Sequence, residues 1–566
     1  MLHYRRSEKF ADARSSAPVR DSARRFAGAA LVGLALLAAL RPGAAQPTRA
    51  PIDTTWRRGG TCYEIFVRSF FDSDGDGIGD FNGLTQKLDY VNDGDPRSTK
   101  SLGAKCIWLM PIDASPSYHG YDVKNYYRVN PEYGTTADFR KLVGEAHRRG
   151  IEVLVDLVLN HASSQHPYFL EALHDPNSPH RNWFRWSATP RDDKGPWGQQ
   201  VWHKSPERDE WYYGIFTSEM PDLNYENPEV RAEAARVAKF WLTEMGVDGF
   251  RLDAVPYLVE QGTQVSNTAG THAVLRDFSA AVRRAARGAF TVGEVWDSIG
   301  AIMPYYPDQL DSYFSFELSD QLLDAVRTGT AARLLASYAR MQRAMPSTRW
   351  SPFLRNHDQT RTLTALGGDR AAARQAAELL LTLPGLPFVY YGEEIGMTGD
   401  KPDLRLRTPM QWTPGRAAGF TTGAPWEPLQ PDTATANVAV ETRDSASLLT
   451  HYRKLIHLRA NDPALGGSDF LPLQSSDPAI AAYLRRDGSH VVLVVANLAN
   501  APRTGVTITS GDTALPVARY SARDLLGGTA GAALDVGVGG RLSAYAPLGA
   551  LSPHQTYVFE LTRRSP

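Results

Sequence analysis

Four short segments carry carboxylate or imidazole side chains at or just after the C-terminal ends of apolar, strand-like runs. The carboxyl ends of parallel strands meet at one edge of a barrel, so these side chains are expected to converge. Any one of them alone could be a solvated loop residue. Four together indicate an enzyme, because a purely structural barrel does not need polar groups there. The segments are Asp156–His161 (DLVLNH), Arg251–Asp253 (RLD), Glu294 and Asn356–Asp358 (NHD).

Asp253 and Glu294 have neighbours that should separate their protonation states. Arg251 lies two residues before Asp253, so on a strand both side chains point to the same face. Its guanidinium favours the ionised form of Asp253. Glu294 is flanked by TVG and VW, an apolar setting in which desolvation raises the pKa of a carboxyl group. One ionised and one protonated carboxyl group are what cleavage of a glycosidic bond requires.

The elements that must position these groups alternate between strand-like runs and amphipathic stretches. This alternation predicts an α/β fold, a parallel (β/α)8 TIM barrel. Most runs are continuously apolar, as expected for strands covered on both faces. A doubly wound open sheet would give a similar pattern. The predicted strands are Tyr63–Val67, Lys105–Met110, Glu152–Leu157, Gly249–Leu252, Phe290–Val292, Ser312–Phe316, Pro352–Leu354 and Phe388–Tyr390, and helices are predicted at Thr136–Arg149, Pro228–Met245 and Thr271–Arg287.

A long segment rich in Trp, Tyr, Pro and charge follows the third predicted strand. A structureless loop of this length is unusual, so we predict that residues 162–227 form a small inserted domain. The alternative, a disordered surface loop, is disfavoured by the aromatic density. After residue 465, β-rich runs punctuated by Gly, Asp and Pro predict an antiparallel β-sandwich. The expected division is 56–161 and 228–464 for the barrel, 162–227 for the insert, and 465–566 for the C-terminal domain.

Residues 1–45 have the layout of a cleavable signal peptide. A basic stretch ending at Arg24 and Arg25 precedes an apolar run, which is shorter than the ~20 residues of a membrane span. We therefore expect a secreted or periplasmic protein with no membrane span after cleavage, and an uncleaved anchor is the alternative. The 61 basic and 62 acidic residues nearly balance, which argues against nucleic acid as a partner. We expect a monomer.

Cys62 and Cys106 are the two cysteines of the chain, too few for a disulfide framework or a structural zinc site. Both begin strand-like runs that are predicted to be neighbours. A disulfide between them and two buried free thiols are therefore both open.

A loop of alternating aspartates predicts a site for a hard cation. It matches the first nine positions of an EF-hand loop, but Gly83 stands at position twelve in place of Glu, so the loop is not an EF-hand. We interpret it as a structural Ca²⁺ site, with an empty acidic turn as the alternative. The expected ligands are Asp72, Asp74, Asp76, the Ile78 carbonyl and Asp80.

Nearly the whole chain after the signal segment resembles glycoside hydrolase family 13, the α-amylase family. DLVLNH, GFRLDAV, GEVW and LRNHD match the family's motifs in order and spacing, and the four together are highly specific. The resemblance implies the barrel, the inserted domain after strand three and a C-terminal β-domain. It also implies a retaining mechanism through a covalent glycosyl-enzyme.

The resemblance assigns roles to individual residues. It implies that Asp253 is the nucleophile, Glu294 the acid/base, and Asp358 a third carboxylate that stabilises the transition state. The residues expected to contact the sugar are His161, Arg251 and His357, together with Tyr121 as a stacking platform and Asp122 as a hydroxyl contact. The aspartate loop resembles the metal loop of the oligo-1,6-glucosidase branch.

Many family members also bind calcium between the barrel and the inserted domain. Asn160 and Asp222 match two of those ligands. A Lys-His pair supplies a backbone contact there, and it is replaced by Pro256 and Tyr257 in this chain. The Lys-His contact to the leaving sugar is lost with it.

Within the family, MPDLN (220–224) resembles a group intermediate between oligo-1,6-glucosidases and neopullulanases. Ala254 after the nucleophile resembles members that act on α-1,4 bonds. RTPMQW (407–412) is shared with the glucosidase and trehalose synthase branches, but Asp403 stands near the place of the arginine that clamps the chain end in exo-acting glucosidases. We expect an α-amylase acting on an α-glucan substrate, starch or maltooligosaccharides.

Three alternatives stay open. The first is α-glucosidase, oligo-1,6-glucosidase or neopullulanase-like activity. The second is trehalose synthase, because DAVPY (253–257) resembles that isomerase, although GEVW resembles hydrolases better. The third is a non-catalytic glucan-binding protein, but such relatives lose the carboxylates, and all three are retained here.

Overall fold

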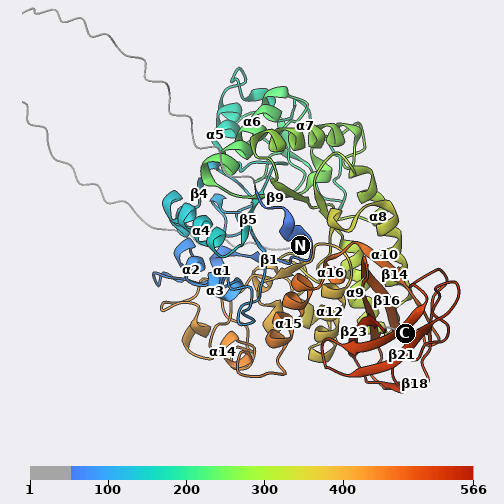
Figure 1. Cartoon of the computed structure of the whole chain (residues 1–566). Helices are drawn as coiled ribbons and strands as arrows, with labels where there is room; N and C mark the ends of the chain where they lie inside the picture. The colour runs from blue at the N-terminus through green and yellow to red at the C-terminus, as the bar shows by residue number, and fades with distance from the viewer. Residues whose placement is uncertain (1–51, 565–566) are drawn as a thin grey trace, which may run out of the picture. The chain divides into compact units, whose positions relative to one another are not determined.

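Eight parallel strands form a nearly closed barrel. The computed structural model describes residues 52–564 (Figure 1). The order of the barrel strands is β12-β11-β10-β9-β5-β2-β1-β13. A parallel bridge between Phe353, just after β12, and Phe388 on β13 joins the two outer strands. The predicted (β/α)8 barrel is therefore confirmed.

Seven barrel strands lie where the apolar runs predict them, and the other is shifted. The strand predicted at 352–354 ends at Ser351, because Pro352 has no N–H to donate to a neighbouring strand. The barrel strands are β1 (Cys62–Ile65), β2 (Cys106–Leu109), β5 (Glu152–Leu157), β9 (Gly249–Leu252), β10 (Phe290–Gly293), β11 (Ser312–Phe314), β12 (Trp350–Ser351) and β13 (Phe388–Tyr390). The short strands β3 (Asp113–Ala114) and β4 (Asn125–Val129) pair with each other beside the barrel.

Helices between the strands begin at side-chain caps. Thr135, Asn227 and Thr268 each accept a hydrogen bond from a backbone N–H of the first turn, which is otherwise without a partner in the helix. The longer helices are α4 (Thr136–Arg148), α6 (Pro228–Phe240, continued by the π-helical turn Trp241–Met245), α7 (Ala269–Ala285), α9 (Phe316–Thr328), α10 (Ala332–Ala344), α12 (Arg370–Thr382) and α15 (Leu448–Asn461). The shorter ones are α1 (Val67–Phe70), α2 (Phe81–Gln86), α3 (Leu88–Val91), α5 (Pro167–His174), α8 (Ile299–Ile302), α11 (Thr362–Ala365), α13 (Asp403–Leu406), α14 (Val438–Glu441) and α16 (Pro463–Gly466).

The barrel interior changes from apolar to charged along the strands. One cluster of buried side chains fills it near the strand starts, including Leu154, Val292 and Phe388. Side chains two positions later on a strand point to the same face, so the next interior layer follows from the sequence. The successive pairs are Cys62 and Glu64 on β1, Leu154 and Asp156 on β5, and Val292 and Glu294 at the end of β10.

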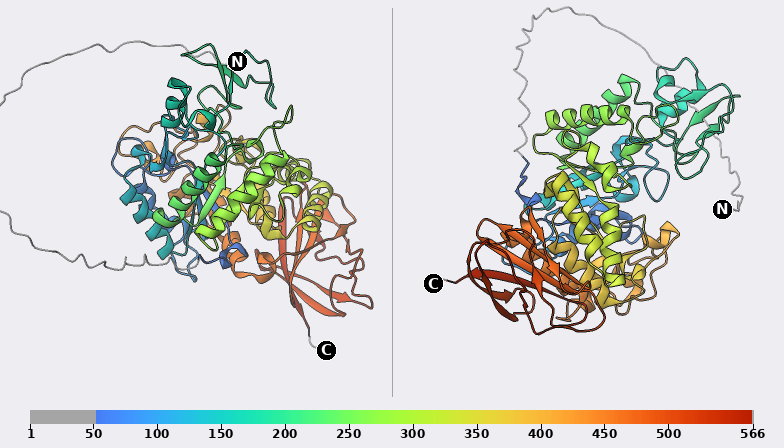
Figure 2. Two further views of the ribbon diagram at one scale, coloured as in Figure 1. Left: turned by 90° about the horizontal axis from the view of Figure 1, so that it is seen from above. Right: turned by 90° about the vertical axis from the view of Figure 1, so that its right-hand side faces the viewer.

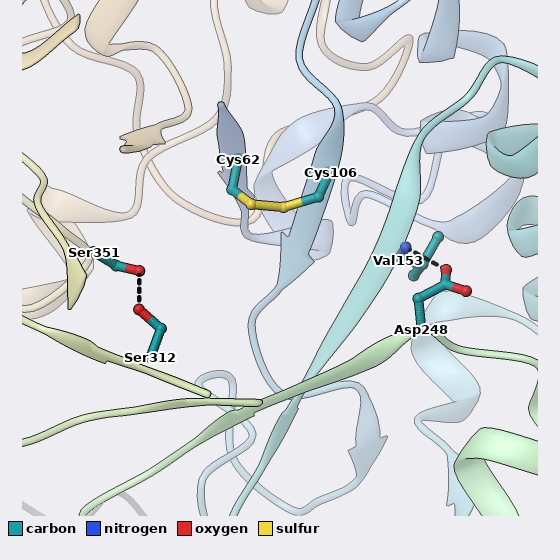
Figure 3. The surroundings of a disulfide bond; sticks show 6 residues. All are labelled: Cys62, Cys106, Val153, Asp248, Ser312 and Ser351. Atoms are coloured by element: carbon teal, nitrogen blue, oxygen red, sulfur yellow. Dashed lines mark hydrogen bonds between the residues drawn. A yellow bond between two sulfur atoms is a disulfide. The ribbon is translucent and has the colours of Figure 1, made fainter. Parts of the chain in front are cut away.

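Cys62 and Cys106 lie opposite each other in register on β1 and β2 and form a disulfide (Figure 3). Their Cα atoms are 4.5 Å apart, and both side chains are fully buried. Around them, the hydroxyls of Ser312 and Ser351 are 2.9 Å apart, joining β11 to β12. Of the two alternatives left open by the sequence, a disulfide or two free thiols, the structure contains the disulfide.

The segment between β5 and α6 is folded. It contains α5 and the antiparallel strands β6 (Trp186–Ser187), β8 (Trp211–Tyr213) and β7 (Trp202–Lys204), in that spatial order. A bridge between His161 and Asp222 joins its two ends. Both views of Figure 2 show this teal-to-green segment extending from the barrel. The boundaries 162–227 stay a prediction, because all described residues belong to one compact unit.

The C-terminal strands are antiparallel, as predicted, and form a six-stranded sheet covered by two small sheets. Alternate residues of β16 face opposite sides: Ile480 and Ala482 pack under the small sheets, whereas Ala481 and Tyr483 join the core that includes α10 and α12 (Figure 1). The large sheet runs β14 (Asp469–Pro472), β16 (Ile480–Asp487), β17 (His490–Asn497), β23 (Gln555–Arg563), β20 (Ala518–Asp524) and β21 (Ala530–Val536). The small sheets are β15 (Gln474–Ser475) with β19 (Ile508–Thr509), and β18 (Arg503–Thr504) with β22 (Ala550–Leu551).

The predicted signal peptide, residues 1–45, lies outside the described residues. Within 52–564, no helix is both long enough and apolar enough to cross a membrane. Export therefore stays a prediction.

Candidate active site

A pocket of about 480 Å³ lies at the carboxyl ends of β9 and β10. It combines three of the predicted carboxylates with a wall of ring side chains. The lining residues are Tyr118, His119, Tyr121, His161, Trp197, Phe216, Thr217, Met220, Asp253, Ala254, Pro256, Tyr257, Glu294, Trp296, Asp358, Asp403 and Arg407.

Arg251 organises the floor of this pocket. Its Nη1 donates to Asp156 Oδ1 at 2.8 Å and to Asp253 Oδ1 at 2.7 Å, and its Nη2 donates to Glu294 Oε2 at 2.7 Å. The guanidinium is 1% exposed, so these bonds are screened little by water. Asp253 and Glu294, distant along the chain, therefore lie side by side on one buried cation.

The protonation of the two carboxyl groups is set mainly by burial. Burial raises the pKa of Glu294 to about 7 and that of Asp253 to about 6, although Arg251 opposes the shift in both. The sequence predicts that Arg251 dominates at Asp253, whereas desolvation outweighs it in the structure. The order of the two groups is as expected: as pH falls, Glu294 takes up its proton first.

Asp358 is held in the ionised form. Its Oδ2 lies 3.1 Å from His357 Nε2, and its Oδ1 accepts from Arg407 Nη2 at 2.8 Å. Burial alone would raise the pKa of Asp358, but these two cations hold it well below its usual range. Burial would likewise lower the pKa of His357, but Asp358 and Glu64 raise it to about 9.

Tyr121 and His161 form the side wall. The Tyr121 ring stacks on His357 with centroids 5.7 Å apart, and its hydroxyl donates to Asp156 at 3.1 Å. His161 Nε2 lies 3.0 Å from the Tyr121 carbonyl. Burial lowers the pKa of His161 to about 4, so its ring is neutral and donates to that carbonyl.

Three predicted sugar contacts lie behind the pocket wall. Arg251 and His357 are almost completely buried and are not lining residues. Asp122 is also outside the lining, because its Oδ1 accepts hydrogen bonds from the hydroxyls of Ser115, at 2.7 Å, and Ser117. Of the predicted contacts, Tyr121 and His161 are the ones that face the pocket.

The structure adds residues that the motifs do not single out. Trp197 and Trp296 are 61% and 53% exposed at the pocket, unusual for large aromatic side chains. Trp197 stacks on Phe216 and Trp296 on Phe316, with centroids 5.6 and 4.5 Å apart. In the sequence Trp296 belongs to GEVW, but nothing marks Trp197 among the other tryptophans of the insert.

The aspartate loop brings together three of its four predicted carboxylates. Single oxygens of Asp72, Asp74 and Asp80 lie within 4.8 Å of one another. Hard oxygen donors in this arrangement fit Ca²⁺. Asp76 is outside the group, and its Oδ1 accepts from the Ile78 N–H at 2.8 Å.

Asn160 and Asp222, which match two ligands of the family's calcium site between barrel and insert, are buried. Asn160 Oδ1 accepts no hydrogen bond from any residue in the described part of the chain. Asp222 is 3% exposed, and burial raises its pKa. These groups fit a cation in part, but Pro256 and Tyr257 stand where the Lys-His pair is expected.

The catalytic-domain model of the α-amylase family ("Alpha amylase, catalytic domain") matches residues 64–467. The chain belongs to the α-amylase family. Alpha-amylase 3 of Dictyoglomus thermophilum is 39% identical over 450 residues, which cover 78% of this chain and 85% of that protein. The trehalose synthase/amylase TreS of Mycolicibacterium smegmatis is 35% identical over 521 residues, covering 80% and 86%. The crystal structure of an α-amylase from H. orenii matches with a TM-score of 0.77 at 39% identity, covering 89% of this chain and 99% of that one.

The family membership expected from the four motifs is confirmed, and with it an enzyme of the glycoside hydrolase type acting on carbohydrate. The relatives with which it is compared include an α-amylase and a trehalose synthase/amylase. The relatives therefore do not settle which reaction this chain catalyses, and we infer the reaction from the residues of the pocket.

Proposed function

We propose that this member of the α-amylase family is a retaining α-glucan hydrolase that cleaves α-1,4-glucosidic bonds of starch and maltooligosaccharides. The observation that carries the proposal is the pair Asp253 and Glu294, bound to two nitrogens of the same guanidinium at the pocket floor. Such closeness supports a retaining enzyme, because an inverting one needs room for a water molecule between its carboxyl groups.

In the first step, the Asp253 carboxylate attacks the anomeric carbon while Glu294 gives its proton to the glycosidic oxygen. The C–O bond breaks, and the leaving sugar departs with that proton. In the second step, Glu294 takes a proton from water, which displaces Asp253 and frees the sugar with its original anomeric configuration. Asp358 stays ionised beside the pocket and stabilises the positive charge that develops on the sugar ring.

The exposed aromatic rim supports a substrate longer than a disaccharide. Trp296 follows the proposed acid by two residues and lines the same pocket. Trp197 offers a second ring face from the inserted segment. Flat apolar faces of this kind suit stacking on sugar rings.

A second candidate is isomerisation of maltose to trehalose. The 35% identity to a trehalose synthase/amylase over most of the chain favours it. In that reaction the freed glucose stays in the pocket and attacks the glycosyl-enzyme in place of water. The exposure of Trp197 and Trp296 means that the pocket is open to solvent at its rim, so water can reach the glycosyl-enzyme, which favours hydrolysis.

Product analysis separates these candidates. The purified protein is incubated with soluble starch, maltoheptaose and maltose, and the products are followed by NMR and chromatography. We expect maltooligosaccharides in the α-configuration, and at least a thousandfold loss of turnover in Asp253→Asn. Trehalose as the main product from maltose would establish the isomerase instead. No turnover of any α-glucan would indicate a non-catalytic binding protein.

We also propose a structural Ca²⁺ held by Asp72, Asp74 and Asp80. The Thr421 hydroxyl donates to Asp72 at 2.5 Å, so an ordered loop would fasten the segment after β13 to the start of the barrel. Export of the protein is proposed as well, and the disulfide between β1 and β2 supports an oxidising compartment.

A further inference from the structure

Glu64 is a buried carboxylate inside the barrel that has no assigned role. It lies on β1, in register with Trp108 on one side and Tyr390 on the other, and its side chain is 2% exposed. Its Oε1 is 2.5 Å from His357 Nδ1. A buried charged group is costly unless it is paired, and His357 supplies the partner for Glu64.

The partners of His357 fix the charge of its ring. Nδ1 faces Glu64, and Nε2 faces Asp358 Oδ2 at 3.1 Å and the Tyr121 hydroxyl at 2.7 Å. An ionised carboxylate only accepts hydrogen bonds, and Tyr121 already donates to Asp156. A carboxylate oxygen thus faces each ring nitrogen, and this geometry fits an imidazolium that donates from both, placed between two carboxylates.

We propose that Glu64 is a positioning residue of this active site, which through His357 keeps Asp358 ionised and oriented toward the sugar. The inference rests on the proposed function, because only there does Asp358 act on the sugar. Glu64 does not line the pocket and does not contact the sugar. Its charge acts on the site through His357, whose protonated form it stabilises.

Other groups around His357 cannot replace Glu64. Asp156 and Asp253 also favour its charge, but Arg251 is bound to both. Arg407 donates to the His357 carbonyl, and the Trp108 ring meets the imidazole edge-on with centroids 5.6 Å apart. Glu64 is thus the carboxylate that pairs with Nδ1, on the side of the ring facing away from Asp358.

Two substitutions separate a charge role from a packing role. Glu64→Gln keeps the size and the acceptor oxygen but removes the charge, whereas Glu64→Asp keeps the charge and shortens the side chain. The kcat/KM of each variant on maltoheptaose is measured from pH 4.5 to 9, after thermal melting has verified folding. We expect the loss in Glu64→Gln to be about fivefold larger at pH 9 than at pH 5.5. A fall of about one unit from a His357 pKa of about 9 lowers the protonated fraction at pH 9 from about one half to about one tenth, and leaves it nearly unchanged at pH 5.5.

We expect the profile of Glu64→Asp to resemble the wild type more closely in shape. A loss that is the same at every pH in both variants, and larger for Glu64→Asp, would mean that Glu64 only packs. Asp253→Asn is measured alongside: if that variant stays active, the proposed function fails, whatever Glu64 does.

A measurement on the unsubstituted protein does not depend on the folding of a Glu64 variant. Histidines labelled with ¹⁵N are titrated by NMR, and the His357 signal is assigned by its absence in His357→Gln. We expect His357 to be protonated at pH 8. A neutral His357 at that pH would overturn the inference.

Discussion

Arg251 forms ion pairs with three carboxylates of the site. It contacts Asp156, Asp253 and Glu294, and all four groups are largely buried. Each carboxylate alone would be expelled from such a place or would take up a proton. The shared cation lets two carboxyl groups of different proton affinity lie within reach of one sugar bond.

The two shifted carboxyl groups predict a bell-shaped pH profile. Asp253 must be ionised to attack, so kcat/KM falls as pH drops through about 6. Glu294 must be protonated to release the leaving group, so kcat/KM falls as pH rises through about 7. Steady-state kinetics on maltoheptaose from pH 4 to 9 should give a maximum between the two midpoints. An activity that is flat up to pH 9 would contradict the assignment of Glu294.

At the residue scale, the sequence predicts the site where strand ends carry motifs and fails where distant segments meet. Asp253, Glu294 and Asp358 all line one pocket, as their positions after strands imply. Glu64 lies inside an apolar strand, and its partner His357 is 293 residues away, so only closure of the barrel reveals the contact. Asp122 is drawn to two nearby serines, which no spacing rule anticipates.

At the element scale, the aspartate loop offers a test with an internal control. Asp74 belongs to the group of close carboxylates and Asp76 does not. Bound Ca²⁺ stabilises the fold by mass action, so EDTA should lower the melting temperature of the wild type by several degrees. Asp74→Asn should melt lower and respond little to EDTA.

Asp76→Asn, which makes the same change in charge, should melt close to the wild type and keep the EDTA response. Calorimetric melting with and without 1–5 mM added calcium, on the order of the affinity of weaker sites, provides the readout. If EDTA changes none of the three melting temperatures, the loop is an empty acidic turn.

The sequence predicts the presence of helices and strands better than the residues at which they begin and end. The continuous apolar runs of buried parallel strands and the capped helix starts are local signals, and the sequence shows both. The shift from 352–354 to β12 depends on Pro352, whose effect on pairing is known only once its neighbouring strand is known. The aromatic residues of the inserted segment predict that it folds, but its small sheet depends on strand pairings that leave no periodic pattern in the sequence.

At the scale of the whole molecule, the disulfide links β1 to β2, the first two strands of the barrel. The last strand, β13, pairs with β1 on its other side. The sequence separation of Cys62 and Cys106 is 44, and a cross-link of that span stabilises a fold by about 3–4 kcal/mol through the unfolded state. The double variant Cys62→Ala/Cys106→Ala should lose about this much free energy of unfolding in urea. Reductant should destabilise the wild type and leave the variant unchanged. Equal stability with and without reductant would show that the bond does not form in solution.

The covalent intermediate gives the most direct test of the central claim. Glu294→Gln is mixed with an α-glycosyl fluoride, whose leaving group needs no proton, so the first step proceeds while the second is slow. The protein is then quenched, digested and examined by peptide mass spectrometry. The proposed mechanism predicts that one sugar unit is attached to the peptide containing Asp253, and that Asp253→Asn/Glu294→Gln carries none. A sugar on Asp156 or Asp358, or turnover of the fluoride with inversion of configuration, would contradict it.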